Sequence, residues 1–310
     1  MSASIDKTMP AFPVKTEYNR CLTVLKRAGI VTLQSKSGSP CIIGTDGTEY
    51  PIPTGEQVAE LFIHNRELIN RKVPQGFDCM ELTPMAMPLL TLVDLLKTAV
   101  TKHAAAGKIF QTRHSPADPL VPVRVNKDKQ VWMWETLRQA VERGELVYFP
   151  QEYTKNHRGQ TKREVISNYH ICAFPGWSVG LIESSPVMPE PGQGKVLADR
   201  KQLEIGFSPN EYRQALQLPP YLGETGRTLE DFITGFLTRL ETTGEVSNDL
   251  ADNNALWCLG QYLKIPYADL VPIGRWIRSV GRARLDLHRS NNKQCTQSVG
   301  AATVVRLIGL

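Results

Sequence analysis

The alternation of apolar and polar residues predicts helices and strands together in the first two thirds of the chain. Apolar residues recur at helical spacing in four segments, at residues 17–28, 54–72, 86–106 and 130–145. Runs rich in β-branched and aromatic residues predict extended structure at residues 41–52, 146–154 and 163–174. The first of these runs has Asp46-Gly47 at its centre, which favours a hairpin turn.

The last third of the chain has a different pattern. Ser208-Pro209-Asn210-Glu211 has the form of a capping box, and Thr228 to Asp231 caps a second helix that ends before Gly244. We therefore expect mainly helical structure from Ser208 to about Gly281. The β-branched end of the chain, AATVVRLIG, predicts a strand that returns to an earlier sheet.

These elements predict an α+β protein, with a mixed, largely antiparallel N-terminal and middle part and a mainly helical C-terminal part. Residues 184–194, SSPVMPEPGQG, are rich in proline and glycine, which exclude a helix or a central strand. We expect this segment to connect a mixed part, residues 1–183, to a helical and basic part, residues 195–310.

Composition narrows the class of protein. Among 310 residues, 41% are hydrophobic and 22% are charged, which is ordinary for a globular chain. No apolar run is long enough to span a bilayer, and the N-terminus lacks the pattern of a secretory signal. Six widely spaced cysteines without a C-x-x-C pair predict reduced thiols in the cytoplasm, with no metal site and no cofactor.

Positive charge gathers near the C-terminus. The chain carries a formal net charge of +5, and the segment from Lys264 to Leu310 holds eight basic residues against Asp269 and Asp286. A localised basic surface is typical of proteins that bind nucleic acid or another anionic partner.

Three of these arginines have the spacing of one helix face. Arg275, Arg278 and Arg282 lie three and four residues apart, and the planar guanidinium group suits phosphate. The alternative is internal pairing, because residues 224–252 contain seven acidic residues and only Arg227 and Arg239.

A second basic element lies between the two expected strands of the middle part. Residues 155–162, KNHRGQTK, with Arg163 next, have the turn residues of an exposed hairpin tip. Aromatic residues flank the tip: Tyr148, Phe149, Tyr153 and Tyr169. Basic and aromatic side chains together favour binding to a phosphate backbone with stacked bases. The alternative is that the lysines only keep an edge hairpin soluble.

Two further motifs are weaker. Residues 256–275 have the apolar spacing of a helix-turn-helix, but Lys264 occupies the turn and Pro272 falls inside the second helix. Gly176-Trp177-Ser178-Val179-Gly180 matches the nucleophile elbow of serine hydrolases. WSVGLIE predicts a strand there, and the helix that must follow an elbow is missing.

The sequence therefore favours a non-catalytic, cytoplasmic protein that binds nucleic acid, either DNA or RNA, mainly through phosphate contacts. Its alternatives are a structural or protein-interaction subunit of a larger assembly and, third, a serine hydrolase that uses Ser178. The expected binding residues are Lys155, Arg158, Lys162, Arg163, Arg275, Arg278, Arg282, Arg284, Arg289 and Lys293.

Overall fold

Eight α-helices and sixteen strands form in the residues that the computed structural model describes, which are 12–31, 33–34, 38–185, 187–291 and 296–309. The helices are α1 (Val14–Arg27), α2 (Gly55–His64), α3 (Arg66–Lys72), α4 (Leu89–Ala105), α5 (Glu135–Glu142), α6 (Lys162–Ile166), α7 (Pro209–Ala215) and α8 (Leu229–Thr243). The predicted α+β class is confirmed.

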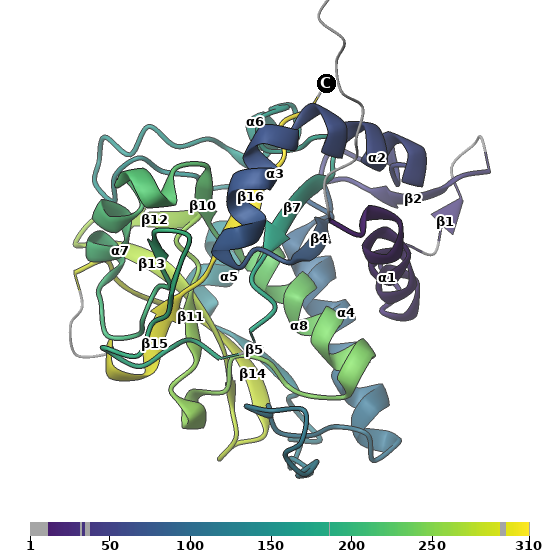
Figure 1. Cartoon of the computed structure of the whole chain (residues 1–310). Coiled ribbons are helices and arrows are strands. Elements are labelled where there is room, and N and C mark those ends of the chain that lie inside the picture. The colour runs from purple at the N-terminus through teal and green to yellow at the C-terminus, as the bar shows by residue number, and fades with distance from the viewer. Residues whose placement is uncertain (1–11, 32, 35–37, 186, 292–295, 310) are drawn as a thin grey trace, which may run out of the picture.

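Two sheets organise the chain (Figure 1). The smaller has the order β10-β16-β7-β4, with β10 (Glu224–Gly226), β16 (Thr303–Arg306), β7 (Ser178–Ile182) and β4 (Cys79–Thr83). All its strand pairs are antiparallel, and Val305 of β16 lies opposite Leu181 of β7. The predicted return of the chain end to an earlier sheet is confirmed.

The larger sheet is built around one long hairpin, β13 (Ala268–Ile277) and β14 (Arg282–Arg289). Five strands extend it: β5 (Val131–Met133), β6 (Val147–Tyr148), β11 (Ala255–Trp257), β12 (Gln261–Ile265) and β15 (Val299–Ala301). β15, β11, β12 and β6 lie on one side of β13, whereas β14 and then β5 lie on the other. β5 pairs only with β14 among the described strands, so it forms an edge of this sheet.

Smaller hairpins complete the topology. β1 (Leu33–Gln34), β2 (Pro40–Ile43) and β3 (Glu49–Pro51) form a three-stranded sheet, and the turn between β2 and β3 contains Gly47 in the left-handed region. The predicted hairpin at Asp46-Gly47 is therefore confirmed. β8 (Val196–Leu197) and β9 (Arg200–Lys201) form a two-stranded sheet.

Helix α8 lies at the centre of the core. It runs beside α4 in Figure 1, and its Phe232 packs under β13. Gly274 permits this contact, because a Cβ atom there would lie 2.6 Å from the Phe232 ring. Phe236 of α8 and Trp276 of β13 pack together in the same part of the core, with ring centroids 6.2 Å apart.

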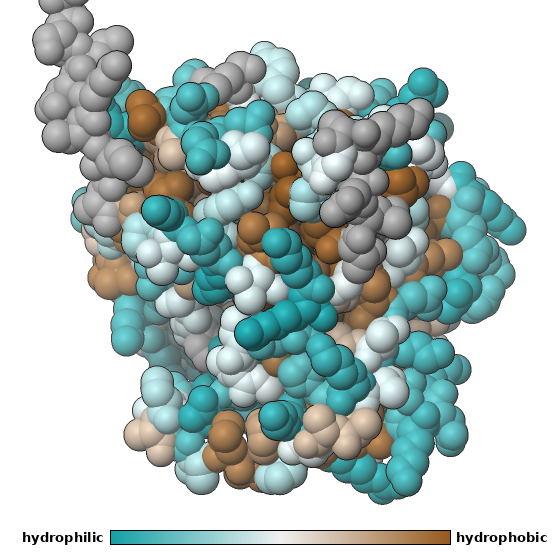
Figure 2. Space-filling view, turned by 90° about the vertical axis from the view of Figure 1, so that its right-hand side faces the viewer, coloured by the Kyte–Doolittle hydropathy of each residue, from teal (hydrophilic) through white to brown (hydrophobic). Residues whose placement is uncertain are grey.

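The face of the molecule that Figure 2 shows is polar over much of its area. Figure 2 views the side of the molecule on which α1 and α4 lie, and hydrophilic side chains spread over this face with hydrophobic ones between them in several places. None of the helices in the described ranges is long and apolar enough to cross a membrane.

The helix starts at Ser208 and Thr228 follow the predicted capping chemistry, and α2 starts at Thr54 in the same way. The side chains of Thr54, Ser208 and Thr228 each accept a hydrogen bond from the backbone N–H of the N3 residue, whose own side chain bonds back. Gly244, with φ 74°, ends α8 as predicted.

Two predictions in the middle of the chain are wrong, and a third holds only in part. Trp132 lies in strand β5 rather than in a helix, and the helix begins only at Glu135. The segment 163–174 is not a strand, because Thr161 and Glu164 form a capping box that starts α6. The strand expected at 146–154 is limited to β6.

The expected helical structure from Ala255 to Gly281 is also wrong, and with it the helix-turn-helix. This region forms β11, β12 and β13. Pro272 is tolerated inside β13 because it lies opposite the break between β11 and β12. Its carbonyl accepts a hydrogen bond from the Cys258 N–H at 2.8 Å there, and its missing N–H interrupts no residue pair of these strands.

The 184–194 segment contains no helix or strand in its described residues, which exclude position 186. Strands from both sides of it share sheets, since β16 pairs with β7 and β12 pairs with β6. The division into residues 1–183 and 195–310 stays a prediction.

Candidate nucleic-acid interface

The hairpin β13–β14 brings several predicted binding residues to one face. Arg275 lies opposite Arg284 across the hairpin, and Arg284 lies opposite Trp132 of β5. Directly opposed residues point to the same side of a sheet. Because side chains alternate along a strand, Arg282 also lies on this side.

Trp132 is the centre of this group. The guanidinium carbon of Arg284 lies 4.4 Å from the centre of the Trp132 ring, and that of Arg282 lies 6.0 Å from it. These distances are within the range of cation–π attraction. Trp134 follows two residues later in extended conformation, so it points to the same side, and 37% of it is exposed. We call Trp132, Trp134, Arg275, Arg282 and Arg284 the arginine–tryptophan face.

The arginine–tryptophan face is electropositive because one carboxylate serves two arginines. Asp286 Oδ2 lies 2.5 Å from Arg275 Nη2 and 2.6 Å from Arg284 Nε. Arg282 has no carboxylate within salt-bridge distance in the part of the chain that the structure describes. Three guanidinium groups around one aspartate leave a local excess of two positive charges.

His288 adds no charge to this surface at neutral pH. Burial lowers the pKa of its imidazole below the ordinary value, and the positive charge of Arg275 lowers it further. Its ring meets the Trp257 ring edge-on, with centroids 6.2 Å apart.

Arg278 behaves as the internal-pairing alternative expects. It lies at the tip of the hairpin, where Nε is 2.9 Å from Asp249 Oδ2 and Nη2 is 2.6 Å from Asp252 Oδ2. Asp249 is fully buried, and burial raises the pKa of its carboxyl above the ordinary value. Arg278 therefore ties the hairpin tip to the segment after α8.

We expect Arg278→Ala to lower the free energy of unfolding by about 1–3 kcal/mol, because a buried carboxylate loses its charged partner. Urea denaturation measures the change. Arg289→Ala is the matched control, since Arg289 is exposed at the end of β14 and should change stability by no more than about 0.5 kcal/mol. Equal losses in the two variants would contradict this role of Arg278.

The residues of the predicted hairpin tip lie elsewhere. Lys155 and Arg158 are exposed in a loop that follows β6, and this loop is closed by the bond from Gln151 N–H to the His157 carbonyl. Arg163 is exposed on α6. β12 and β13 lie between β6 and β14, so the two predicted basic elements occupy opposite sides of β13.

The aromatic residues that flank this loop mostly point inward. Tyr153 is buried, and its hydroxyl donates to the Leu259 carbonyl at 2.8 Å. Tyr148 is buried with its hydroxyl on Glu230, and Phe149 lies under the Arg306 guanidinium. Tyr169 is exposed. Lys293, the last predicted binding residue, lies outside the described residues.

Lys162 is held by an ion pair. Its Nζ lies 2.5 Å from Glu230 Oε1, and Glu230 is fully buried. The Tyr148 hydroxyl donates to the same oxygen at 2.8 Å, and Gln261 donates to the other carboxylate oxygen.

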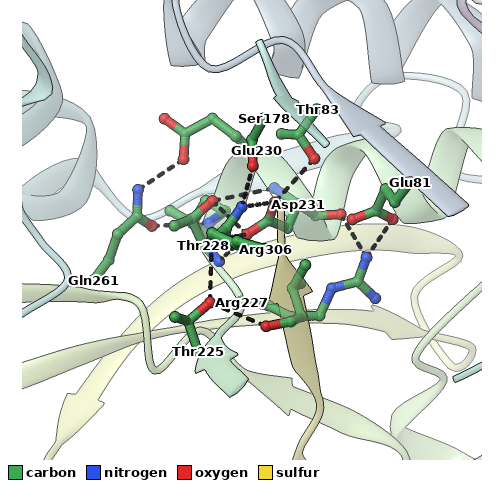
Figure 3. A network of polar contacts seen from close by, with 12 residues as sticks. Glu81, Thr83, Ser178, Thr225, Arg227, Thr228, Glu230, Asp231, Gln261 and Arg306 are labelled. Carbon is green, nitrogen blue, oxygen red and sulfur yellow. Dashed lines mark hydrogen bonds and ion pairs between the residues drawn. The ribbon is translucent and has the colours of Figure 1, made fainter. Parts of the chain in front are cut away.

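A second charged network is buried between α8 and the four-stranded sheet (Figure 3). Arg306 donates to Asp231 Oδ2 at 2.5 Å and to the Ser178 hydroxyl oxygen at 2.7 Å. Thr83 donates to Asp231 at 2.9 Å. The network joins β4, β7 and β16 to α8, which makes it a structural element of the core.

Ser178 belongs to this network. It lies in β7, as the sequence predicts, and 1% of it is exposed. Its hydroxyl oxygen accepts the hydrogen bond from Arg306, so the serine of the G-x-S-x-G motif faces a cation inside the core.

Trp132 and Trp134 are the members of the arginine–tryptophan face that the sequence does not single out as binding residues. The signal was strand alternation, because Arg282, Arg284 and Asp286 alternate with Ala283, Leu285 and Leu287. Among the described residues, no group of three or more histidine, cysteine, aspartate and glutamate side chains could hold a metal ion.

Comparisons with protein-family models, with curated proteins and with solved structures found no significant match.

Proposed function

We propose that this protein binds single-stranded nucleic acid through the arginine–tryptophan face. The observation that carries the proposal is the pair of arginines, Arg282 and Arg284, over the ring of Trp132 at the edge of an open sheet. Arginine supplies phosphate contacts, and tryptophan supplies a stacking surface that accepts any base. The proposal keeps the cytoplasmic location that the sequence favours.

The surface extends beyond the sheet edge. A cavity of about 510 Å³ lies at the tip of the hairpin, between the 124–128 loop and Ser279–Val280. Arg124 and Lys127 line it against Asp128. Close packing holds this loop to the hairpin, since a Cβ atom on Gly281 would lie 2.4 Å from the Arg124 carbonyl oxygen. Arg124 and Lys127 therefore add positive charge near the start of β14, where a phosphate backbone could make further contacts.

Single strands fit this surface better than duplexes. Stacking on Trp132 and Trp134 requires bases that are not paired. The β13–β14 hairpin is flanked by β5 on one side and by β11 and β12 on the other, so it is not a free two-stranded ribbon that could enter a major groove. The contacts involve charge and aromatic surface, so binding should depend little on base sequence.

The salt dependence of binding tests the proposal. We expect the double variant R282Q/R284Q to flatten the slope of log K against log salt on a single-stranded oligonucleotide by about 1–1.5, because each lost phosphate contact removes about 0.7. Fluorescence anisotropy with labelled dT20 and rU20 at several salt concentrations measures the slope.

The double variant K26Q/R27Q is the control. It removes the same charge from exposed residues at the end of α1 and should leave the slope unchanged. Parallel slopes for the wild type and R282Q/R284Q would overturn the proposed site.

A further inference from the structure

A cavity of about 930 Å³ shares no residue with the arginine–tryptophan face. Three segments supply most of its lining: the β2–β3 turn with Thr45 and Asp46, the end of α5 with residues 141–146, and residues 161–167 at α6. This volume lies in the range of small-molecule sites.

Part of the cavity wall is apolar. Leu89, Leu146 and Ile166 line it together with the ring of Tyr148. All four of these residues are buried, so their positions are fixed by the core behind them. This part of the wall suits the flat, weakly polar surface of a nucleobase.

Lys162 supplies an oriented cation. Its side chain is 16% exposed, and Glu230 holds its Nζ from behind while the Tyr148 ring lies 5.2 Å away. A lysine ammonium has three N–H donors. Glu230 is the one carboxylate within salt-bridge distance of Nζ in the described residues, which leaves donors for a ligand in the cavity. Arg143 and Arg163 line the same space and are exposed.

Asp46 supplies an acceptor. The Tyr50 hydroxyl donates to Asp46 Oδ2 at 2.7 Å, and the Thr48 N–H donates to Oδ1 at 2.9 Å. These hydrogen bonds, that from Tyr50 first, lower the pKa of the Asp46 carboxyl, so it is ionised at neutral pH. An ionised carboxylate on a cavity wall binds hydroxyl groups and repels phosphate.

We infer that this cavity binds a nucleoside monophosphate. The phosphate contacts Lys162 and Arg163, a ribose hydroxyl donates to Asp46, and the base lies against the apolar wall. Each end of such a ligand meets a side chain of matching chemistry. A simple anion would leave Asp46 and the apolar wall without a ligand contact, and a neutral nucleoside would leave Lys162 and Arg163 without one.

Isothermal titration of the full chain with AMP tests the inference. We expect adenosine and inorganic phosphate to bind at least tenfold more weakly than AMP, because each lacks one half of the contacts. Arg163→Gln should weaken AMP binding roughly tenfold, through loss of a charge-assisted contact. Asp46→Asn should weaken AMP and adenosine by similar factors and should not weaken phosphate, because it removes an acceptor of hydroxyl groups and no phosphate contact.

Matched variants keep the result interpretable. Lys162 is left in place, because its loss would leave Glu230 buried without a cation. Lys155→Gln removes an exposed charge from the preceding loop, outside the cavity, and should not change AMP binding. Absence of AMP binding, or AMP binding that neither Arg163→Gln nor Asp46→Asn weakens, would overturn the inference.

AMP binding in the cavity can be tested separately from nucleic-acid binding at the arginine–tryptophan face. R282Q/R284Q should bind AMP like the wild type, and Arg163→Gln should keep the salt slope on dT20. Loss of AMP binding in R282Q/R284Q would contradict an independent site.

Discussion

Asp231→Asn is expected to lower the free energy of unfolding by about 3–5 kcal/mol, because it removes one partner of a buried ion pair. Asp231 is fully buried, and the side chain of Arg306 is 2% exposed. Asp231 Oδ2 also accepts hydrogen bonds from the backbone and the hydroxyl of Thr228 at the start of α8. Chemical denaturation at neutral pH measures the loss.

The pH dependence of this loss follows from the ionisation of Asp231. Burial by itself would raise the pKa of the carboxyl, but Arg306 and then Arg227 hold it below its ordinary value of 3.8. Folding therefore favours the ionised form. The stabilisation is complete well above pH 3.8 and is lost as the pH falls through the lower pKa of the folded state. The difference in stability between wild type and D231N should accordingly shrink as the pH falls below about 4.

Asp94→Asn is the control for this experiment. Asp94 is exposed on α4, and the same chemical change there should stay within about 0.5 kcal/mol. A loss in D231N no larger than that in D94N would mean that the network in Figure 3 does not stabilise the core.

Local chemistry accounts for what the sequence predicted correctly. Capping boxes at Thr54, Ser208 and Thr228 depend on residues three positions apart, so they can be recognised without the fold. The turn at Asp46-Gly47 is equally local, because glycine reaches the left-handed region that the turn needs. Thr161 and Glu164 obey the same rule, and their capping box starts α6 where the β-branched and aromatic residues alone predict a strand.

The long hairpin shows where two periodicities compete. The spacing of Arg275, Arg278 and Arg282 fits a helix face, whereas the alternation from Arg282 to His288 fits a strand. The strand pattern describes the structure, and Gly281, with φ 64°, makes the turn between the two strands. The arginine spacing alone favours a helix, whereas the apolar residues Ala283, Leu285 and Leu287, which alternate with the charged ones on the other face of β14, indicate a strand.

Charge along the chain does not reveal how charges pair. Arg278 forms ion pairs with Asp249 and Asp252, which are 29 and 26 residues away along the chain. Arg282 has no carboxylate within salt-bridge distance among the described residues. The sequence could not distinguish these two arginines, because the pairing depends on the place of each one in the hairpin: Arg278 lies in the turn and Arg282 begins β14. The acids of α8 were equally hidden, since Glu230 and Asp231 are buried in pairs with Lys162 and Arg306.

Trp132→Ala is expected to weaken binding to dT20 or rU20 roughly five- to 150-fold, because a stacked base contributes about 1–3 kcal/mol. Trp134→Ala should act in the same direction. Neither change removes a charge, so the slope of log K against log salt should stay that of the wild type. This separates stacking from the phosphate contacts of Arg282 and Arg284.

Tyr169→Ala decides between the two basic elements of the chain. Tyr169 is 57% exposed and closely follows α6, the helix that carries Arg163, along the chain. If the arginine–tryptophan face binds the strand, Tyr169→Ala should leave the affinity unchanged while Trp132→Ala lowers it. Trp132→Phe should recover part of the affinity that Trp132→Ala loses, because a smaller ring still stacks. Circular dichroism of each variant checks that it is folded. The opposite result, with Tyr169→Ala weakening binding and Trp132→Ala having no effect, would move the nucleic-acid site to the 155–163 loop.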